Sequence, residues 1–91
     1  MKKAKKYIVK GIVQGVGFRF FTMRIAERIG VLGYVRNLYD ESVEVYAIGT
    51  EEQLNNLKQK LSEGSSYSRV DNVIEEDMPV DKNYRTFNIK H

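Results

Sequence analysis

Gly11-Ile12-Val13-Gln14-Gly15-Val16-Gly17-Phe18-Arg19 is the stretch that decides the fold of this chain, because it predicts a strand end, a glycine-rich turn and a helix start. Glycine lets the backbone bend back and approach a ligand without a clash from a Cβ atom. The N–H groups at a helix start lack partners within the helix, and a guanidinium beside them completes an anion site. The stretch therefore predicts a loop that holds a phosphate, although a purely structural turn explains the glycines equally well.

The hydrophobic pattern on either side of this stretch predicts one strand and one helix. Residues alternate in polarity over Tyr7–Val13, which is typical of a strand with one buried face. After the glycines the period becomes helical, and Gly30 suits the C-terminus of the helix. The apolar stripe that would face the core consists of Phe18, Phe21, Ile25, Ala26 and Ile29.

A hairpin is predicted next. Two strand patterns, Val31–Leu38 and Ser42–Ile48, are joined by the short polar link Tyr39–Glu41. Glutamate at the end of this link is unusual, because a two-residue hairpin turn of the primed type prefers glycine there. On the second strand the residues expected to face inward are Val43, Val45 and Ala47, and those expected to face outward are Glu44 and Tyr46.

The rest of the chain predicts a helix and two strands. Thr50–Gln53 has the pattern of a capping box, and leucines at helical spacing run from it toward Gly64. After a loop at Ser65–Ser68, the segment Val70–Asp77 predicts a strand. A short last strand covers Thr86–Lys90.

The predicted order is β-α-β-β-α-β with a short extra C-terminal strand, which fits a single domain, residues 1–91, of the α+β class. Right-handed crossovers place both helices on one face of an antiparallel sheet, which is the ferredoxin-like two-layer sandwich. This fold hosts enzymes, RNA binders and metal carriers, so it does not by itself name a function.

Composition excludes several classes of function. The 91 residues include no cysteine and a single histidine, His91, so disulfides, thiol nucleophiles and Cys/His metal sites are not expected. His91 itself is expected to be a solvated chain end. No apolar run is long enough to span a membrane, and no hydrophobic signal segment follows the N-terminal lysines. We therefore expect a cytoplasmic protein with no cofactor, no metal and no membrane partner.

The charge is unevenly distributed. Residues 1–37 carry nine lysines and arginines against one acid, Glu27, whereas the rest of the chain is net acidic. A positive field around the glycine-rich stretch would favour an anionic ligand. The N-terminal lysines have a simpler explanation, because charged residues near a terminus commonly do no more than solvate it. These lysines are Lys2, Lys3, Lys5 and Lys6.

Two side chains are candidates for the chemistry. Arg19 follows Phe18, a predicted core residue, so its backbone is held while its planar charged fork can turn into the loop. Asn37 ends the strand before the hairpin, and its amide oxygen could hold a water, although asparagine there is more often a turn residue. The Gly15–Gly17 turn lacks the lysine of a P-loop and the third glycine of a dinucleotide fingerprint, so no nucleotide site is expected.

The stretch Gly11–Arg19, followed by Gly33-Tyr34-Val35-Arg36-Asn37, resembles the paired signatures of the acylphosphatase family. Ser42–Gly49 and Phe87–Ile89 are also similar to that family, and the resemblance covers essentially the whole chain. It implies hydrolysis of acyl phosphates to a carboxylate and inorganic phosphate, with no metal or other cofactor. It also implies that Asn37 positions the attacking water. The phosphate would be bound by the Arg19 side chain and by backbone N–H groups of Gln14, Gly15, Val16, Gly17, Phe18 and Arg19.

The residue types agree with this chemistry. The leaving carboxylate has a pKa of about 4 and departs without a proton. Phosphoryl transfer then needs mainly positioning and positive character around the phosphate oxygens, which Arg19, the amides and the helix dipole supply. Asparagine cannot take a proton at neutral pH, so we hypothesise that the phosphate accepts it. An essential enzyme base in the pH–rate profile would contradict this hypothesis.

Two positions depart from the usual family pattern. Tyr34 stands where tryptophan is usual, and Glu41 stands where the hairpin often has Asp-Gly. Neither is expected to carry chemistry.

Two rival interpretations belong to other classes of function. An RNA-binding module of this fold would stack bases on outward strand aromatics, but the third strand offers only Tyr46. A non-catalytic domain serving a partner protein would not need both Arg19 and Asn37. We therefore expect a monomer that takes a small acyl phosphate as substrate and has no nucleic-acid partner. Inorganic phosphate or another anion can also occupy its loop.

Overall fold

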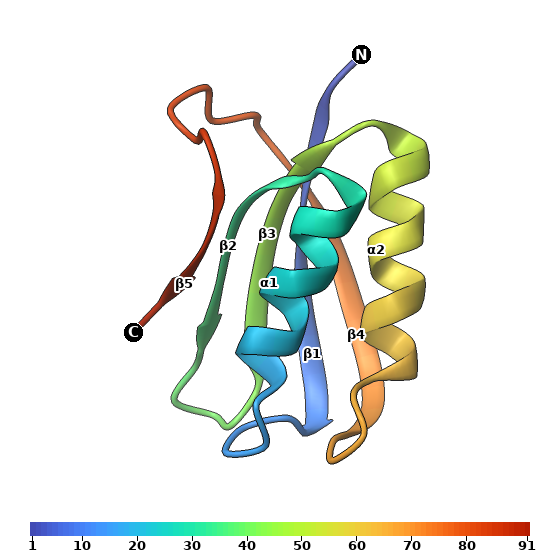
Figure 1. The fold of residues 1–91 in the computed structure, drawn as a ribbon, viewed down its shortest axis with the longest axis vertical. Coiled ribbons are helices and arrows are strands. Elements are labelled where there is room, and N and C mark those ends of the chain that lie inside the picture. The colour runs from blue at the N-terminus through green and yellow to red at the C-terminus, as the bar shows by residue number, and fades with distance from the viewer.

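A computed structural model describes all 91 residues and contains five strands and two helices (Figure 1). In chain order these are β1 (Lys3–Ile12), α1 (Phe18–Ile29), β2 (Leu32–Asn37), β3 (Val43–Gly49), α2 (Glu51–Glu63), β4 (Arg69–Met78) and β5 (Phe87–Lys90). The predicted order of elements is confirmed. Neither helix combines the length and the apolar character that crossing a membrane requires.

β1 begins at Lys3, earlier than its polarity pattern indicated. The alternation is hidden in the sequence because the first half of the strand is rich in lysine. These lysines are strand residues whose charges meet acids of the neighbouring strand β4, where Lys5 pairs with Glu75 and Lys6 pairs with Glu76. Such cross-strand pairs of opposite charge support a sheet without apolar alternation.

The five strands form one sheet in the order β4-β1-β3-β2-β5, and both helices lie on one face of it (Figure 1). The ferredoxin-like arrangement is therefore confirmed. β1 to β4 pair antiparallel, whereas the added strand β5 runs parallel to β2, so the complete sheet is mixed. Because β2 and β5 run the same way, Arg36 pairs with Lys90, and the ends of the two strands lie side by side.

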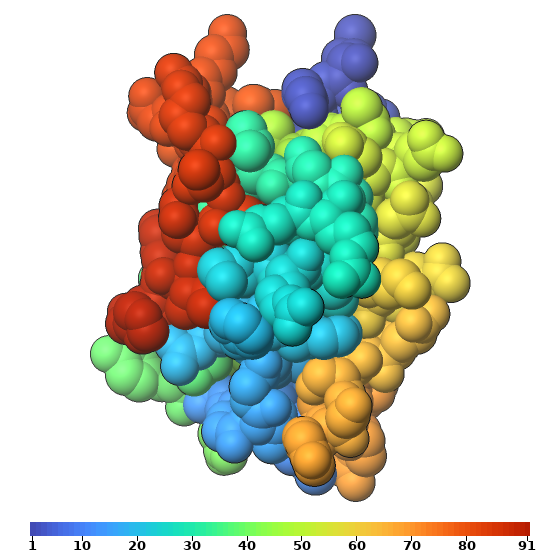
Figure 2. All heavy atoms as spheres, viewed as in Figure 1, coloured from blue at the N-terminus to red at the C-terminus, as the bar shows by residue number.

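The core fills the space between the sheet and the helices. The helices α1 and α2 cover the centre and the right of the face seen in Figure 2. On α1, Phe18 and Ala26 of the predicted stripe are fully buried, while its other members pack at the core margin. α2 contributes its leucines, as its spacing predicted. The core residues from the sheet include Tyr7, Val9, Val35, Val43, Val45, Ala47 and Phe87, and Val13 joins them directly after β1.

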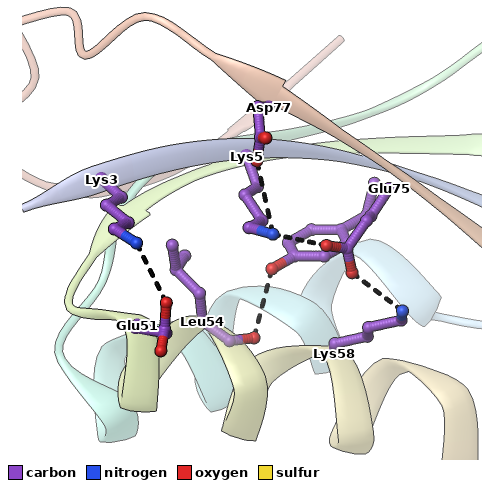
Figure 3. Close-up of polar contacts among 8 residues, drawn as sticks. Lys3, Lys5, Glu51, Leu54, Lys58, Glu75 and Asp77 are labelled. Atoms are coloured by element: carbon purple, nitrogen blue, oxygen red, sulfur yellow. Dashed lines mark hydrogen bonds and ion pairs between the residues drawn. The ribbon is translucent and has the colours of Figure 1, made fainter.

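Polar contacts hold α2 against β1 and β4 (Figure 3). The buried Tyr7 donates a hydrogen bond from Oη to the carbonyl oxygen of Leu54, 3.2 Å away. Lys5 of β1 and Lys58 of α2 both pair with Glu75 of β4, with 2.8 Å between Lys58 Nζ and Glu75 Oε1. Burial raises the pKa of Tyr7 to about 12, so its hydroxyl keeps its proton and remains a donor.

The opposite face of the sheet carries a second packed cluster. Glu44 and Tyr46 point away from the helices, as predicted, but only 6% of each is exposed. The cause is the segment between β4 and β5, which crosses this face. Tyr46 Oη donates to the carbonyl oxygen of Pro79 at 2.7 Å and accepts from the N–H of Asp81 at 3.0 Å. The aromatic ring of Tyr46 is therefore covered rather than solvated.

Glu44 is held within this cluster by two donors from β2. Tyr34 donates to Glu44 Oε2 at 2.5 Å, and Arg36 Nε donates to the same oxygen at 3.0 Å. The rings of Tyr34 and Tyr46 stack beside the carboxylate, with 5.6 Å between their centroids. A carboxylate in so apolar a setting depends on its donors to stay charged.

The hairpin between β2 and β3 is a three-residue loop. Leu38 N–H donates to the carbonyl oxygen of Ser42 at 2.9 Å, and Asp40 Oδ1 accepts from Ser42 N–H at 3.0 Å. Glu41 has a φ of 73° and is the only non-glycine residue with positive φ. The loop thus ends in a left-handed residue, which suits glycine and strains glutamate. It is not the two-residue primed turn considered for this link.

We predict that Glu44→Gln makes the protein less stable at pH 7 and that this deficit shrinks as the pH falls from about 5 toward 3. Burial alone raises the pKa of Glu44, but the hydrogen bonds from Tyr34 and Arg36 and the charge of Arg36 leave it lowered overall. A carboxylate with a lowered folded-state pKa stabilises the fold above its unfolded pKa, about 4.3, and loses that effect as pH falls through the folded value.

Urea unfolding at a series of pH values measures this effect. Glu27→Gln, at an exposed position with no ion pair, is the matched control and should show no such pH dependence. A deficit of the same size at pH 7 and pH 3 would show that the charge of Glu44 is not what matters.

Candidate active site

The loop between β1 and α1 is shaped by two glycines in the left-handed conformation. Gly15 has a φ of 74° and Gly17 a φ of 78°. A Cβ atom added at either position would meet no other atom within 4 Å. Space is therefore not the constraint. These positions favour glycine because of their backbone conformation, which residues with a Cβ atom adopt only at a cost in energy.

This loop presents a row of free backbone N–H groups. Gly17 is the N-cap of α1 and has no side chain to cap the helix. The first helical hydrogen bond runs from Phe21 N–H to the carbonyl oxygen of Gly17, at 3.0 Å. The N–H groups of residues 15–20 therefore have no acceptor within the protein. Together with the helix dipole they form a cradle with positive character.

Arg19 lies in the first turn of α1, beside this cradle. Its neighbour Phe18 is 1% exposed, so packing holds the backbone at Arg19 in the way the sequence predicted. Arg19 Nη1 lies 3.3 Å from the carbonyl oxygen of Lys90 and 3.3 Å from Nδ1 of His91. No carboxylate forms an ion pair with Arg19. The guanidinium is thus oriented by the end of β5 while its charge is left uncompensated.

Asn37 is the last residue of β2 and pairs with Val43 of β3. Its Oδ1 atom is buried and has no hydrogen-bond partner in the protein. Leaving a buried amide oxygen unpaired is costly, so native proteins rarely do so without a reason. An unsatisfied acceptor beside an anion cradle is suited to hold a water molecule.

These groups surround one hollow with a cavity volume of about 190 Å³. Of the residues predicted from sequence, Gly15, Gly17, Phe18, Arg19 and Asn37 line it together, whereas Gln14 and Val16 do not. The full lining is Val13, Gly15, Gly17, Phe18, Arg19, Phe20, Asn37, Ile89 and His91.

Gln14 and Val16 instead support the loop. Val16 packs against the core. Gln14 Nε2 donates to the carbonyl oxygens of Leu38 and Ser42, each at 2.8 Å. The side chain of Gln14 thus connects the cradle to the hairpin that follows Asn37. No local pattern in the sequence predicts this role.

Comparison with known proteins identifies the family. The family model described as Acylphosphatase matches residues 5–89. The chain is also 45% identical over 87 residues to an acylphosphatase of Pasteurella multocida, covering 96% of this chain and 97% of that protein. The chain belongs to the acylphosphatase family.

Solved structures agree with this membership. The crystal structure of acylphosphatase from Bacillus subtilis matches with a TM-score of 0.93 and 32% identity, and each chain is covered completely. Full-length HypF in its phosphate- and nucleotide-bound form matches with a TM-score of 0.88 and 28% identity. That match covers all of this chain but 12% of HypF, so the fold also occurs as one part of a much longer protein.

Tyr34, which we expected to depart from the family pattern, lies away from the hollow. Tyr34 belongs to the cluster on the opposite face of the sheet, where it contacts Tyr46 and Glu44. It is not part of the lining that contains Arg19 and Asn37. Tyr34 therefore contributes to the packing of the outer face and not to the candidate active site.

The structure corrects the expectation that His91 is only a solvated chain end. His91 is exposed, but it lines the hollow and contacts Arg19. Alternation along β5, where Phe87 and Ile89 face inward, places residue 91 on the same side. The sequence could not show which strand β5 pairs with, and only its parallel pairing with β2 brings this end to the site.

We predict that Gln14→Ala lowers the free energy of unfolding by about 1–2 kcal/mol, because two hydrogen bonds between the cradle and the hairpin are lost. Urea unfolding measures the change. Gln59→Ala, on the exposed face of α2, is the control and should cost less than about 0.5 kcal/mol. Equal stability of the two variants would mean that Gln14 does not hold the loop in place.

Proposed function

We propose that this member of the acylphosphatase family hydrolyses acyl phosphates to a carboxylate and inorganic phosphate by direct, metal-free attack of water. The observation that carries the proposal is that free loop amides, an unpaired arginine and an unsatisfied buried amide oxygen line one small hollow. The proposal includes residues 1–91 acting as one domain, as a monomer and in the cytoplasm. All the residues that line the hollow come from one chain, which supports a site that works in a monomer.

The cradle and Arg19 bind the phosphoryl group in this proposal. The N–H groups of the loop point their dipoles toward an anion, and the guanidinium adds a fork of charged donors. Positive character around the equatorial oxygens stabilises the transition state of phosphoryl transfer. Of the residues predicted to bind phosphate, Gly15, Gly17, Phe18 and Arg19 line the hollow, and Gln14 and Val16 contribute through the backbone of the loop.

Asn37 orients the nucleophile. Its Oδ1 accepts a hydrogen bond from a water molecule, which leaves an oxygen lone pair free to attack phosphorus. The new bond forms between the water oxygen and phosphorus while the bond from phosphorus to the acyl oxygen breaks. The acyl group leaves as a carboxylate whose pKa is about 4, so it needs no general acid.

The proton released by the water goes to a phosphate oxygen. Asn37 is not basic, and the imidazole of His91, the other candidate base in the lining, contacts Arg19 through Nδ1. A limb of the pH–rate profile that disappears in His91→Gln would identify His91 as the base instead.

We predict that Arg19→Ala lowers kcat/KM for acetyl phosphate by about 10²–10³-fold, because a charged donor to the transition state is lost. Arg19→Lys should also be poor, since one ammonium cannot replace a planar fork. Phosphate release is measured with and without EDTA, and the rate of the unaltered protein should not change on chelation. Arg85→Ala, on the exposed β4–β5 segment, is the control. Turnover by Arg19→Ala at the wild-type rate would contradict the assignment.

For Asn37→Ala we expect kcat to fall by about a hundredfold while inhibition by inorganic phosphate persists, because the water loses its orientation but the cradle is intact. Steady-state kinetics with phosphate as a competitive inhibitor separates the two effects. Asn55→Ala, on the exposed surface of α2, is the control. If phosphate inhibition were lost together with activity, Asn37 would be a phosphate-binding residue rather than the one that orients water.

A further inference from the structure

A second and larger groove continues from the candidate active site along α1. Its volume is about 500 Å³, and it lies between α1 and the α2–β4 loop. Gly17 and Phe20 line both this groove and the catalytic hollow, so the two spaces adjoin. In Figure 1 the β1–α1 loop and the α2–β4 loop lie at the same end of the molecule. A ligand whose phosphate sits in the cradle can therefore extend into this groove.

The part of the groove nearest the hollow is apolar and aromatic. Phe21 and Ile25 of α1 form its floor with Phe20, and Tyr67 of the α2–β4 loop lines the other side. Phe20 is 54% exposed and Tyr67 is 84% exposed, which is a large exposed aromatic surface for so small a protein. Exposed apolar surface of this kind beside a polar site is typical of a ligand-binding groove.

The farther part of the groove carries two uncompensated positive charges. Arg24 and Arg28 are one helical turn apart, line the groove, and form no ion pair. The guanidinium of Arg24 lies over the ring of Phe20, 5.8 Å from its centroid. Glu63 of α2, which lines a neighbouring hollow together with Arg28, pairs with Lys60 and not with either arginine. Two neighbouring guanidinium groups beside an apolar surface suit the recognition of an anion.

We propose that this groove binds the acyl half of the substrate, and that the preferred acyl phosphates carry an apolar body ending in a second anionic group. The inference rests on the proposed function, which places the phosphate in the cradle. Arg24 follows Gly17, the cradle residue that lines both spaces, by seven residues, which places it on the same face of α1 about 10.5 Å along the helix axis. A benzene ring between two acidic groups, together with the reach of an arginine side chain, can span that distance. The apolar part of such a substrate would contact Phe20, and its far anionic group would meet Arg24 and Arg28.

The test compares two rigid ligands that differ only at the far end. They are the phosphonate analogues of 4-carboxybenzoyl phosphate and 4-methylbenzoyl phosphate, in which CH₂ replaces the bridging oxygen so that neither is hydrolysed. Calorimetry should show the carboxylate ligand binding roughly tenfold more tightly than the methyl ligand, as expected for charge-assisted hydrogen bonds. The double variant Arg24→Gln/Arg28→Gln should lose this preference and bind both ligands alike.

A matched control removes two positive charges elsewhere. Lys82→Gln/Arg85→Gln lies on the β4–β5 segment, which does not line the groove and is at the opposite end of the molecule from the β1–α1 and α2–β4 loops (Figure 1). This control should keep the tenfold preference. If it loses the preference as fully as the arginine variant does, long-range charge explains the effect and the groove proposal fails. The proposal also fails if the wild type shows no preference, or if Arg24→Gln/Arg28→Gln retains it.

Turnover separates this inference from the function on which it rests. Acetyl phosphate does not reach the arginines, so its kcat/KM in Arg24→Gln/Arg28→Gln should stay within about twofold of the control variant. Hydrolysis of acetyl phosphate without ligand discrimination would overturn the groove proposal alone. Ligand discrimination without any hydrolysis of acetyl phosphate would overturn the proposed function and support the groove as an anion-binding site.

Discussion

The uncapped N-terminus of α1 is the constraint on which the rest of the site depends. The same protein closes the start of its other helix with a capping box: Gln53 N–H donates to Thr50 Oγ1 at 3.2 Å, and Thr50 N–H donates to Gln53 Oε1 at 2.9 Å. α1 has glycine at that place, so its free N–H groups receive no side-chain cap and are left to water or to a bound anion. The buried ring of Phe18 holds this helix start in position. Binding of an anion there is therefore coupled to the stability of the loop.

Strand topology gathers the remaining groups around that helix start. Antiparallel pairing of β2 with β3 brings Asn37 beside the hairpin, and Gln14 ties the hairpin to the cradle. Parallel pairing of β2 with β5 brings the carbonyl oxygen of Lys90 to Arg19. Three chain segments far apart in sequence thus meet at one end of the sheet. A rigid scaffold of this kind fixes the relative positions of the groups before substrate binds, which phosphoryl transfer requires.

The sequence was sufficient for the fold and for the groups that act through local patterns. Alternation, helical spacing and the glycine-rich stretch placed Arg19 and Asn37 on the correct elements. It was not sufficient where a residue acts through a distant partner. The contacts of Gln14 with the hairpin and of His91 with Arg19 depend on pairings that no local period encodes. The burial of Tyr46 likewise depends on an irregular segment crossing the outer face. Because this segment covers the ring of Tyr46, the structure also argues against RNA binding, since base stacking needs exposed aromatic faces.

The structure also divides the basic half of the sequence into two parts with different roles. The lysines of β1 are largely neutralised, because Lys3, Lys5, Lys6 and Lys10 each pair with an acid from another element. The arginines of α1 are not, since Arg19, Arg24 and Arg28 have no carboxylate partner. Positive potential is therefore concentrated along one helix, beginning at its uncapped end. Arg19 lines the catalytic hollow and the other two arginines line the adjoining groove, so the uncompensated positive charge extends from one space to the other.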